Sequence, residues 1–229
     1  MSVTTAITAL TTTSLVSLGT SDIASLTTAQ IAALSTTQTA VLKVSQIASI
    51  ATVQFVAFTS SDVAAFTTTQ VRSLATSQIG TLLTAQVLAL TTTQITAITT
   101  TQQLSLTSKE INTLTTDQLD NLTTTQVRAI TTTQVQGISS IQLGALTTAQ
   151  ISALSSTEVA AMSTALVHGF TTTQIGALST TQLAQLGTTQ LNALGSLQVA
   201  GLSSDQIITL TSTAFSALTS KQISGLPPT

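Results

Sequence analysis

Apolar residues recur along this chain with a period of eight. The first apolar position of each unit, the first anchor, is occupied by an apolar residue 28 times, from Leu10 to Leu226. The unit continues with Thr or Ser, two small polar residues, Gln, a second apolar residue (the second anchor) and two small residues. Residues 90–97 are one such unit, and Ile98 begins the next. A fixed short period is typical of repeat architectures, in which each unit is stabilised by its neighbours.

The unit fits a short, capped α-helix. In residues 26–34, Thr27 stands at the N-cap and Gln30 three residues later at position N3, which is the spacing of a capping box. Leu26 and Ile31 then occupy the two positions of a hydrophobic staple. Leu34 ends this helix and directly precedes the next cap. The pattern therefore predicts an all-α solenoid with one helix of about seven residues per octad and a single cap residue between helices.

Substitutions at two positions support the helix. The cap position holds Ser or Thr in 20 of 27 octads and Gly in three, and all of these are acceptable caps. The Gln position holds Gln in 20 octads and an acid in four, and acids also suit a helix N-terminus. A β-solenoid is the alternative, because Thr, Ile and Val favour strands. Against it, the anchors are five and three residues apart, which places them on opposite faces of a flat strand.

Representative octads define the residues that we expect to carry the fold. The capping pairs are Thr27 and Gln30, Thr67 and Gln70, Thr91 and Gln94, Thr123 and Gln126, and Thr171 and Gln174. The core anchors are Leu26, Ile31, Leu34, Leu90, Ile95, Ile98, Leu146, Ile151 and Leu154. In this interpretation the anchors form the core, and Thr, Ser and Gln form a neutral exterior.

Two stretches depart from the pattern. The second anchor is polar only at Thr39 and Gln103, and at Gln103 the apolar residue follows one position late, as Leu104. We expect a local irregularity there. We also expect a distorted or wider section where three Phe anchors lie beside four non-standard caps: Phe55, Phe58, Phe66, Lys43, Ala51, Ala75 and Leu83. The residue before each first anchor is usually small, which suggests close backbone approach between successive helices or turns.

Composition narrows the function classes. Only 5% of the residues are charged, against about 25% in ordinary domains. The net charge of −2 argues against nucleic acid and against an anionic membrane surface. The chain has no Cys and no apolar stretch long enough for a transmembrane segment. Its first seven residues show no cleavable secretory signal. No linker is visible, so we expect a single domain over residues 1–229 with a stop at Pro227 and Pro228.

Candidate chemistry is sparse. His168 is the only imidazole, and we interpret it as a solvated surface residue, because no orienting acid and nucleophile accompany it. The densest charged group is Lys109, Glu110, Asp117 and Asp120, which lacks the pattern of a calcium loop and is interpreted as solvated helix faces. We therefore expect no metal site, no cofactor and no enzymatic activity.

The unit Leu-Thr-Thr-x-Gln-Ile-x-Ala-Leu, as in residues 146–154, resembles the Thr/Gln-rich octapeptide arrays of large bacterial surface or secreted repeat proteins. The resemblance implies extracellular structural or adhesive material, such as a biofilm component. Because neither end carries a polar capping repeat, we expect head-to-tail self-assembly into a filament or surface layer. An adhesin that binds cell-surface or matrix components and an ice-binding protein are alternative functions, and a cytoplasmic location is the alternative to an extracellular one.

Overall fold

The computed structural model describes residues 7–227, which form short helices joined by turns and contain no strand. The predicted all-α solenoid is confirmed, and the β-solenoid alternative is wrong for this range. The chain divides into two compact units, an N-terminal unit (Met1–Leu114) and a C-terminal unit (Thr115–Thr229). The octad pattern passes from Leu114 to Thr115 as an ordinary anchor and cap, and the single domain over residues 1–229 stays a prediction.

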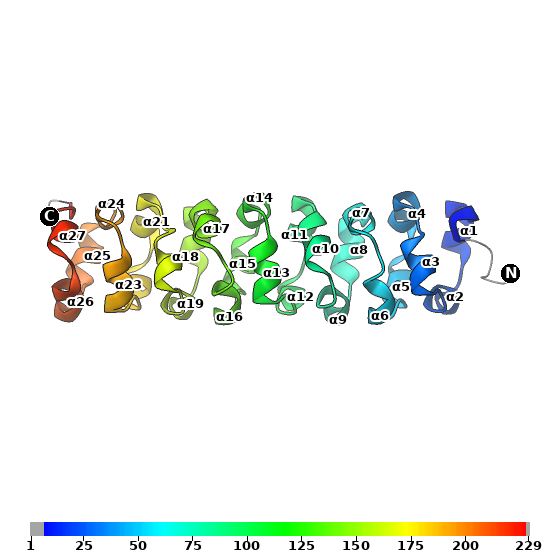
Figure 1. Cartoon of the computed structure of the whole chain (residues 1–229), viewed down its shortest axis with the longest axis horizontal. Helices are drawn as coiled ribbons and strands as arrows, with labels where there is room; N and C mark the ends of the chain where they lie inside the picture. Colours follow the sequence, from blue (N-terminus) through cyan, green and yellow to red (C-terminus); the bar gives the residue numbers. More distant parts are fainter. Residues whose placement is uncertain (1–6, 228–229) are drawn as a thin grey trace. The chain divides into compact units, whose positions relative to one another are not determined.

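The helices follow one another in chain order, as Figure 1 shows. The N-terminal unit contains η1 (Ile7–Ala9), α1 (Thr12–Ser17), α2 (Thr20–Ala24), α3 (Thr28–Ala32), α4 (Thr36–Val41), α5 (Val44–Ala48), α6 (Thr52–Phe55), α7 (Ser60–Ala65), α8 (Thr68–Ser73), α9 (Thr76–Ile79), α10 (Thr84–Ala89), α11 (Thr92–Ala97), α12 (Thr100–Gln103) and α13 (Ser108–Thr113). The C-terminal unit contains α14 (Thr116–Asp120), α15 (Thr124–Arg128), α16 (Thr132–Val135), α17 (Ser140–Ala145), α18 (Thr148–Ala153), α19 (Ser156–Ala160), α20 (Thr164–Val167), α21 (Thr172–Ala177), α22 (Thr180–Ala184), α23 (Thr188–Ala193), α24 (Ser196–Val199), α25 (Ser204–Thr209), α26 (Ser212–Ala217) and α27 (Ser220–Ile223).

The helices are shorter than the seven residues predicted. The first anchor at the end of each octad lies outside the helix, as does the N-cap of the next helix. α4, for example, has six residues and ends at Val41, and the C-cap Leu42 that follows is non-helical (φ −57°, ψ 134°). The next residue, Lys43, is extended and is the N-cap of α5. Each junction therefore contains at least two non-helical residues, the first anchor or its predecessor and the cap, where the sequence predicted one.

Within each unit the helices wind into a superhelix. Each helix packs against the third helix after it, as α4 does with α7 and α18 does with α21. Figure 1 shows α4 and α7 side by side, although α5 and α6 separate them in the chain. Such short helices have little stability of their own, so contacts between successive turns must hold them.

The anchors form the core of each unit. Of the predicted core anchors, Ile31, Ile95 and Ile151 are at most 2% exposed, and the others are at most 5% exposed (Leu26, Leu34, Leu90, Ile98, Leu146 and Leu154). The irregularity expected at Gln103 is absent. Gln103 is buried at the end of α12, and Leu104 is 55% exposed, so the register of the repeat is kept and the polar side chain enters the core.

The stretch with three Phe anchors forms an aromatic cluster in the N-terminal unit. Phe55 stacks on Phe66 with ring centroids 6.0 Å apart. Phe58 meets both rings edge to face, at 5.3 Å from Phe55 and 5.2 Å from Phe66. All three rings are at most 4% exposed, so this section of the core is filled by larger side chains than the Leu, Ile and Val of other turns.

Candidate functional site: the glutamine joint between turns

Each standard helix begins with a capping box. In α3, Thr27 Oγ1 accepts a hydrogen bond from the Gln30 N–H at 3.2 Å, and Gln30 Oε1 accepts one from the Thr27 N–H at 2.8 Å. The same reciprocal pair forms at the other four predicted positions: Thr67 and Gln70, Thr91 and Gln94, Thr123 and Gln126, and Thr171 and Gln174. These bonds satisfy backbone N–H groups that a helix N-terminus leaves without an intrahelical partner.

The Gln half of the box persists where the cap hydroxyl is missing. Lys43, Ala51, Ala75 and Leu83 are N-caps without a side-chain cap bond. Their N–H groups nevertheless donate to the Oε1 of the Gln three residues later, at 2.6–2.9 Å. The Gln side chain is therefore the more constant partner, which indicates that it does more than cap its own helix.

The second role of Gln is to join one turn of the superhelix to the previous one. In α11, Gln94 Nε2 donates to the carbonyl oxygens of Val63 at 2.9 Å and Phe66 at 2.6 Å. These carbonyls lie at the C-terminal end of α7, the fourth helix before α11. We call this arrangement the glutamine joint: Oε1 caps the N-terminus of one helix, and Nε2 caps the C-terminus of another. One amide thus satisfies backbone groups at two helix ends.

The joint recurs in both units. Gln residues that donate to the fourth helix before their own include Gln38, Gln46, Gln54, Gln70, Gln78, Gln86, Gln94 and Gln102 in the N-terminal unit, and Gln150, Gln174, Gln182, Gln190, Gln198, Gln206 and Gln222 in the C-terminal unit. Most of these side chains are only 1–5% exposed. The expectation that Gln belongs to the exterior is therefore wrong, because the Gln amide is buried between two turns and hydrogen-bonds to both.

The joint also defines the superhelix. A helix packs along the third helix before it, but its N-terminal Gln bonds to the end of the fourth. Within each unit, one superhelical turn therefore contains between three and four helices. The joint also explains why Gln is so frequent, since an ionised carboxylate can accept at the cap but cannot donate to the carbonyls.

Asp62, an acid at the Gln position, is hydrogen-bonded to Thr39, a polar residue at a second anchor. Asp62 is 1% exposed; its Oδ2 accepts from the Thr59 N–H at 2.9 Å, and its Oδ1 accepts from Thr39 Oγ1 at 3.3 Å. Thr39 is itself the polar residue at a second anchor, and it is fully buried. The two departures from the octad thus face each other across turns, and each gives the other a hydrogen-bond partner.

The remaining acids keep only the capping half. Glu110 Oε2 accepts from the Thr107 N–H, and Glu158 Oε2 accepts from the Ser155 N–H, both at 2.7 Å. Glu110 is only 9% exposed, so its assignment to a solvated helix face is wrong. Its burial follows from its place at the joint, where Gln is buried in other octads.

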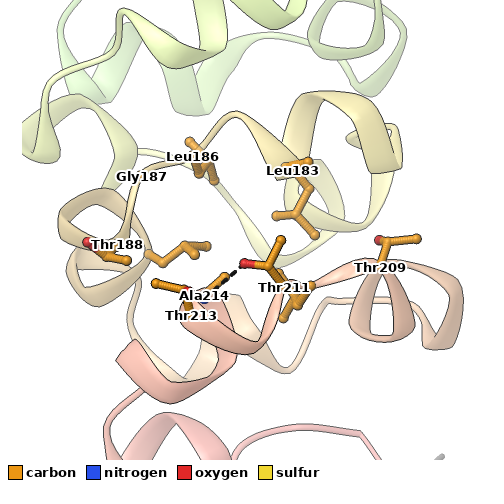
Figure 2. Close-up of a pocket in the computed structure, with 11 residues that line it drawn as sticks. Leu183, Leu186, Gly187, Thr188, Thr209, Thr211, Thr213 and Ala214 are labelled. Atoms are coloured by element: carbon orange, nitrogen blue, oxygen red, sulfur yellow. Dashed lines mark hydrogen bonds between the residues drawn. The ribbon is translucent and has the colours of Figure 1, made fainter.

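Two octads of the C-terminal unit have neither Gln nor an acid at this position. Leu166 replaces Gln in α20 and is buried, so it fills the space with apolar atoms. Ala214 replaces Gln in α26 and leaves a cavity of about 160 Å³. Figure 2 shows this cavity, with the bond from the Ala214 N–H to Thr211 Oγ1 dashed. The sequence signal was the absence of Gln in a position that otherwise holds it.

Comparison with known families identifies the repeat. The model of the ALTTAQ repeat matches residues 15–52, 55–92, 124–156, 156–188 and 180–212, which together cover most of the chain. The chain belongs to the ALTTAQ repeat family. Each matched copy is 33–38 residues long, slightly more than four octads, and four octads separate two helices linked by a glutamine joint. A search of the curated proteins gave no match.

Glycine residues allow close backbone contacts between turns of the ALTTAQ repeats. A Cβ added to Gly201 would lie 2.2 Å from the Thr172 carbonyl oxygen, and one added to Gly169 would lie 2.3 Å from that of Ser140. No residue in 7–227 has a positive φ, so glycine is needed here for its missing Cβ and not for its backbone freedom. The close backbone approach inferred from small residues before the first anchor is found at these corners.

The sequence-predicted chemical residues of the ALTTAQ chain are not gathered into a site. His168 is exposed at the end of α20, and Asp117, Asp120 and Lys109 are exposed as well. Within residues 7–227, no group of three or more His, Asp or Glu side chains could hold a metal ion. A membrane crossing needs a long apolar helix, and this range contains no helix that meets both conditions.

Proposed function

We propose that this ALTTAQ repeat protein is a structural, non-enzymatic module that stacks on further copies of itself, end to end, in a filament or surface layer outside a bacterial cell. The observation that carries the proposal is the repetition of the octad itself. The same apolar anchors recur in nearly every turn, so the packing that joins turns within one chain is also available between chains.

The last described turn offers the surface for such a contact. Phe215 and Ile223 are 40% and 44% exposed, whereas the second anchors of the preceding turn, Leu191 and Val199, are at most 1% exposed. Exposed second anchors are apolar surface that a further turn covers elsewhere in the chain. We propose a second copy as the occupant, because its first turn has the same octad pattern and almost no charge to oppose contact.

The junction between copies is weaker than the joints within a chain. At the first turn, Ser14 and Asp22 stand where Gln stands in later octads, so neither position supplies the amide of a glutamine joint. The contact depends mainly on Phe215 and Ile223. Assembly is therefore concentration-dependent and reversible.

Electron microscopy and sedimentation velocity of the purified 229-residue chain test the proposal. Filaments or higher oligomers that grow with concentration are expected, and Phe215→Ser should shift their onset to at least tenfold higher concentration. Val53→Ser is the matched control, because Val53 is apolar and 72% exposed but belongs to α6 of the N-terminal unit. A chain that stays monomeric at millimolar concentration contradicts the proposal.

The extracellular location rests on the resemblance to bacterial surface repeats, and protease treatment of intact cells tests it. Adhesion and ice binding receive less support from the geometry. An ice-binding lattice would use Thr hydroxyls, but the cap hydroxyls of Thr67, Thr91, Thr123 and Thr171 already accept hydrogen bonds from their own helices. Absence of thermal hysteresis is therefore the expected result.

A further inference from the structure

The cavity at Ala214 retains the backbone groups of a glutamine joint without the glutamine. By the spacing of the joint, the Gln amide at this position would bond the Thr211 N–H and the carbonyls of Leu183 and Leu186. All three residues line the cavity. Within residues 7–227, no side chain donates to either carbonyl or accepts from the Thr211 N–H.

The octads on both sides show what this set of groups binds. Gln206 accepts from the Ser203 N–H at 2.7 Å and donates to the Ile175 and Leu178 carbonyls at 2.9 and 2.7 Å. Gln222 makes the corresponding three bonds, each at 2.8 Å. In both neighbours, one N–H and two carbonyls enclose a primary carboxamide. In the Ala214 octad, the residues that carry the same three groups line the cavity.

The surrounding helices form without the missing amide. α26 runs over Ser212–Ala217, and Thr211 Oγ1 caps it by accepting from the Ala214 N–H at 3.1 Å. The cavity is not filled by a larger neighbour, in contrast to the octad of Leu166, where the Leu side chain itself occupies the joint. The Ala214 cavity is therefore preorganised for an external group.

We propose that this cavity is a binding site for a primary carboxamide with a short aliphatic tail. The amide oxygen accepts from the Thr211 N–H, and the NH₂ group donates to the Leu183 and Leu186 carbonyls. The tail lies against the Leu191 and Leu210 side chains, which also line the cavity. The volume of about 160 Å³ suits such a ligand, since an apolar cavity of about 150 Å³ holds a benzene molecule.

The same groups give the site its selectivity. A carboxylate would place a second acceptor against the two carbonyls, and a ketone would leave both carbonyls without a donor. Propionamide is therefore expected to bind, and its analogues propionate and butanone are expected to bind at least tenfold more weakly. This site is independent of the proposed self-assembly, because it lies between α22 and α26 within one chain.

Titration of the ¹⁵N- and methyl-labelled chain, followed by NMR, tests the proposal. Propionamide should shift the Thr211 amide and Ala214 methyl signals saturably, with a Kd on the order of millimolar for a ligand of five non-hydrogen atoms. Ala214→Gln should abolish the shift of the Thr211 amide, because the new side chain completes the joint. Ala214→Leu is the matched control for lost volume, since Leu166 fills the same position of its own octad, and it should abolish the Thr211 amide shift as well without supplying an amide.

Two further comparisons test whether the cavity selects a primary carboxamide, and whether that amide belongs to a polypeptide or to a free small molecule. Butanone or propionate binding as tightly as propionamide, or no saturable shift in the wild-type chain, overturns the proposal. Retention of the Thr211 amide shift in Ala214→Gln also overturns it, because binding would then lie elsewhere. Where propionamide binds as expected, N-acetylglutamine N-methylamide distinguishes the sources. Tighter binding of this peptide identifies a glutamine side chain of a polypeptide as the natural occupant, and weaker binding identifies a free amide.

Discussion

The two units differ in the residue that precedes the first anchor, where one turn of the superhelix approaches the previous turn. After the four-residue helix α24, the residue before the first anchor is Gly201, which lies against the Thr172 carbonyl. After the four-residue helix α6, the equivalent residue is Ala57, which carries a Cβ. Cβ atoms do not approach backbone atoms within 3.0 Å, and a Cβ on Gly201 would lie 2.2 Å from Thr172 O. The corner at Ala57 is therefore wider.

The wider corner lies beside the aromatic cluster. Phe55 ends α6 and Phe58 follows Ala57, so the larger rings fill the core where the turns stand farther apart. In the C-terminal unit, Val199 takes the place of Phe55 and Gly201 that of Ala57. At these two corners the larger core residue accompanies the wider corner, in line with a close-packed interior that leaves no empty space. The same octad accommodates both solutions.

The largest effect is expected from removal of a ring. Phe55→Ala should destabilise the chain by about 4 kcal/mol, because Phe55 is fully buried and the wide section cannot collapse onto the space. Phe215→Ala is the control, since Phe215 occupies a second anchor but is 40% exposed, and it should cost less than half as much. Chemical denaturation of both variants measures the difference. Equal losses would show that burial in the cluster does not contribute.

A smaller loss is expected from an added methyl group at the tight corner. Gly201→Ala should cost about 2–3 kcal/mol, because the Cβ forces the Thr172 backbone away and disturbs the neighbouring turn. Gly195→Ala serves as the control. Its Cβ would meet only the Gln198 side chain at 3.5 Å, and its φ of −73° suits Ala, so the change should cost at most about 1 kcal/mol, because Gly is the better N-cap of the two. If Gly201→Ala were neutral in urea denaturation, the corner would not be tight.

Local features of the octad were predictable from the sequence, because they are set within eight residues. The capping pair of Thr27 and Gln30 and the burial of Ile31 follow from helix geometry alone. The glutamine joint was not predictable, since its partners lie 28 and 31 residues away and this offset depends on the superhelix. The repeated choice of Gln over Glu was the available signal, because only Gln can both accept and donate.

Exceptions to the octad were recognisable one at a time but not as pairs. Thr39 and Asp62 are both unusual in the sequence, yet only the packing of α4 against α7 places them in contact. Burial of Glu110 was missed for the same reason, because a capping acid looks solvent-exposed until the previous turn covers it. The tight and wide corners likewise depend on how far apart successive turns stand, which no eight-residue pattern specifies.

The smallest effect should come from the reciprocal change at the wide corner. Ala57→Gly gives the corner after α6 the same residue that the tight corner has at Gly201. Because the wide corner already accepts a Cβ, the variant gains no relief from crowding and loses only the methyl contact and some chain stiffness, at a cost of about 0.5–1 kcal/mol. Urea denaturation beside Gly201→Ala measures both. If Ala57→Gly stabilised the chain, crowding would exist at Ala57 too, and the two units would close their turns alike. A modest loss, together with the larger loss at Gly201, would show that backbone spacing differs between the units.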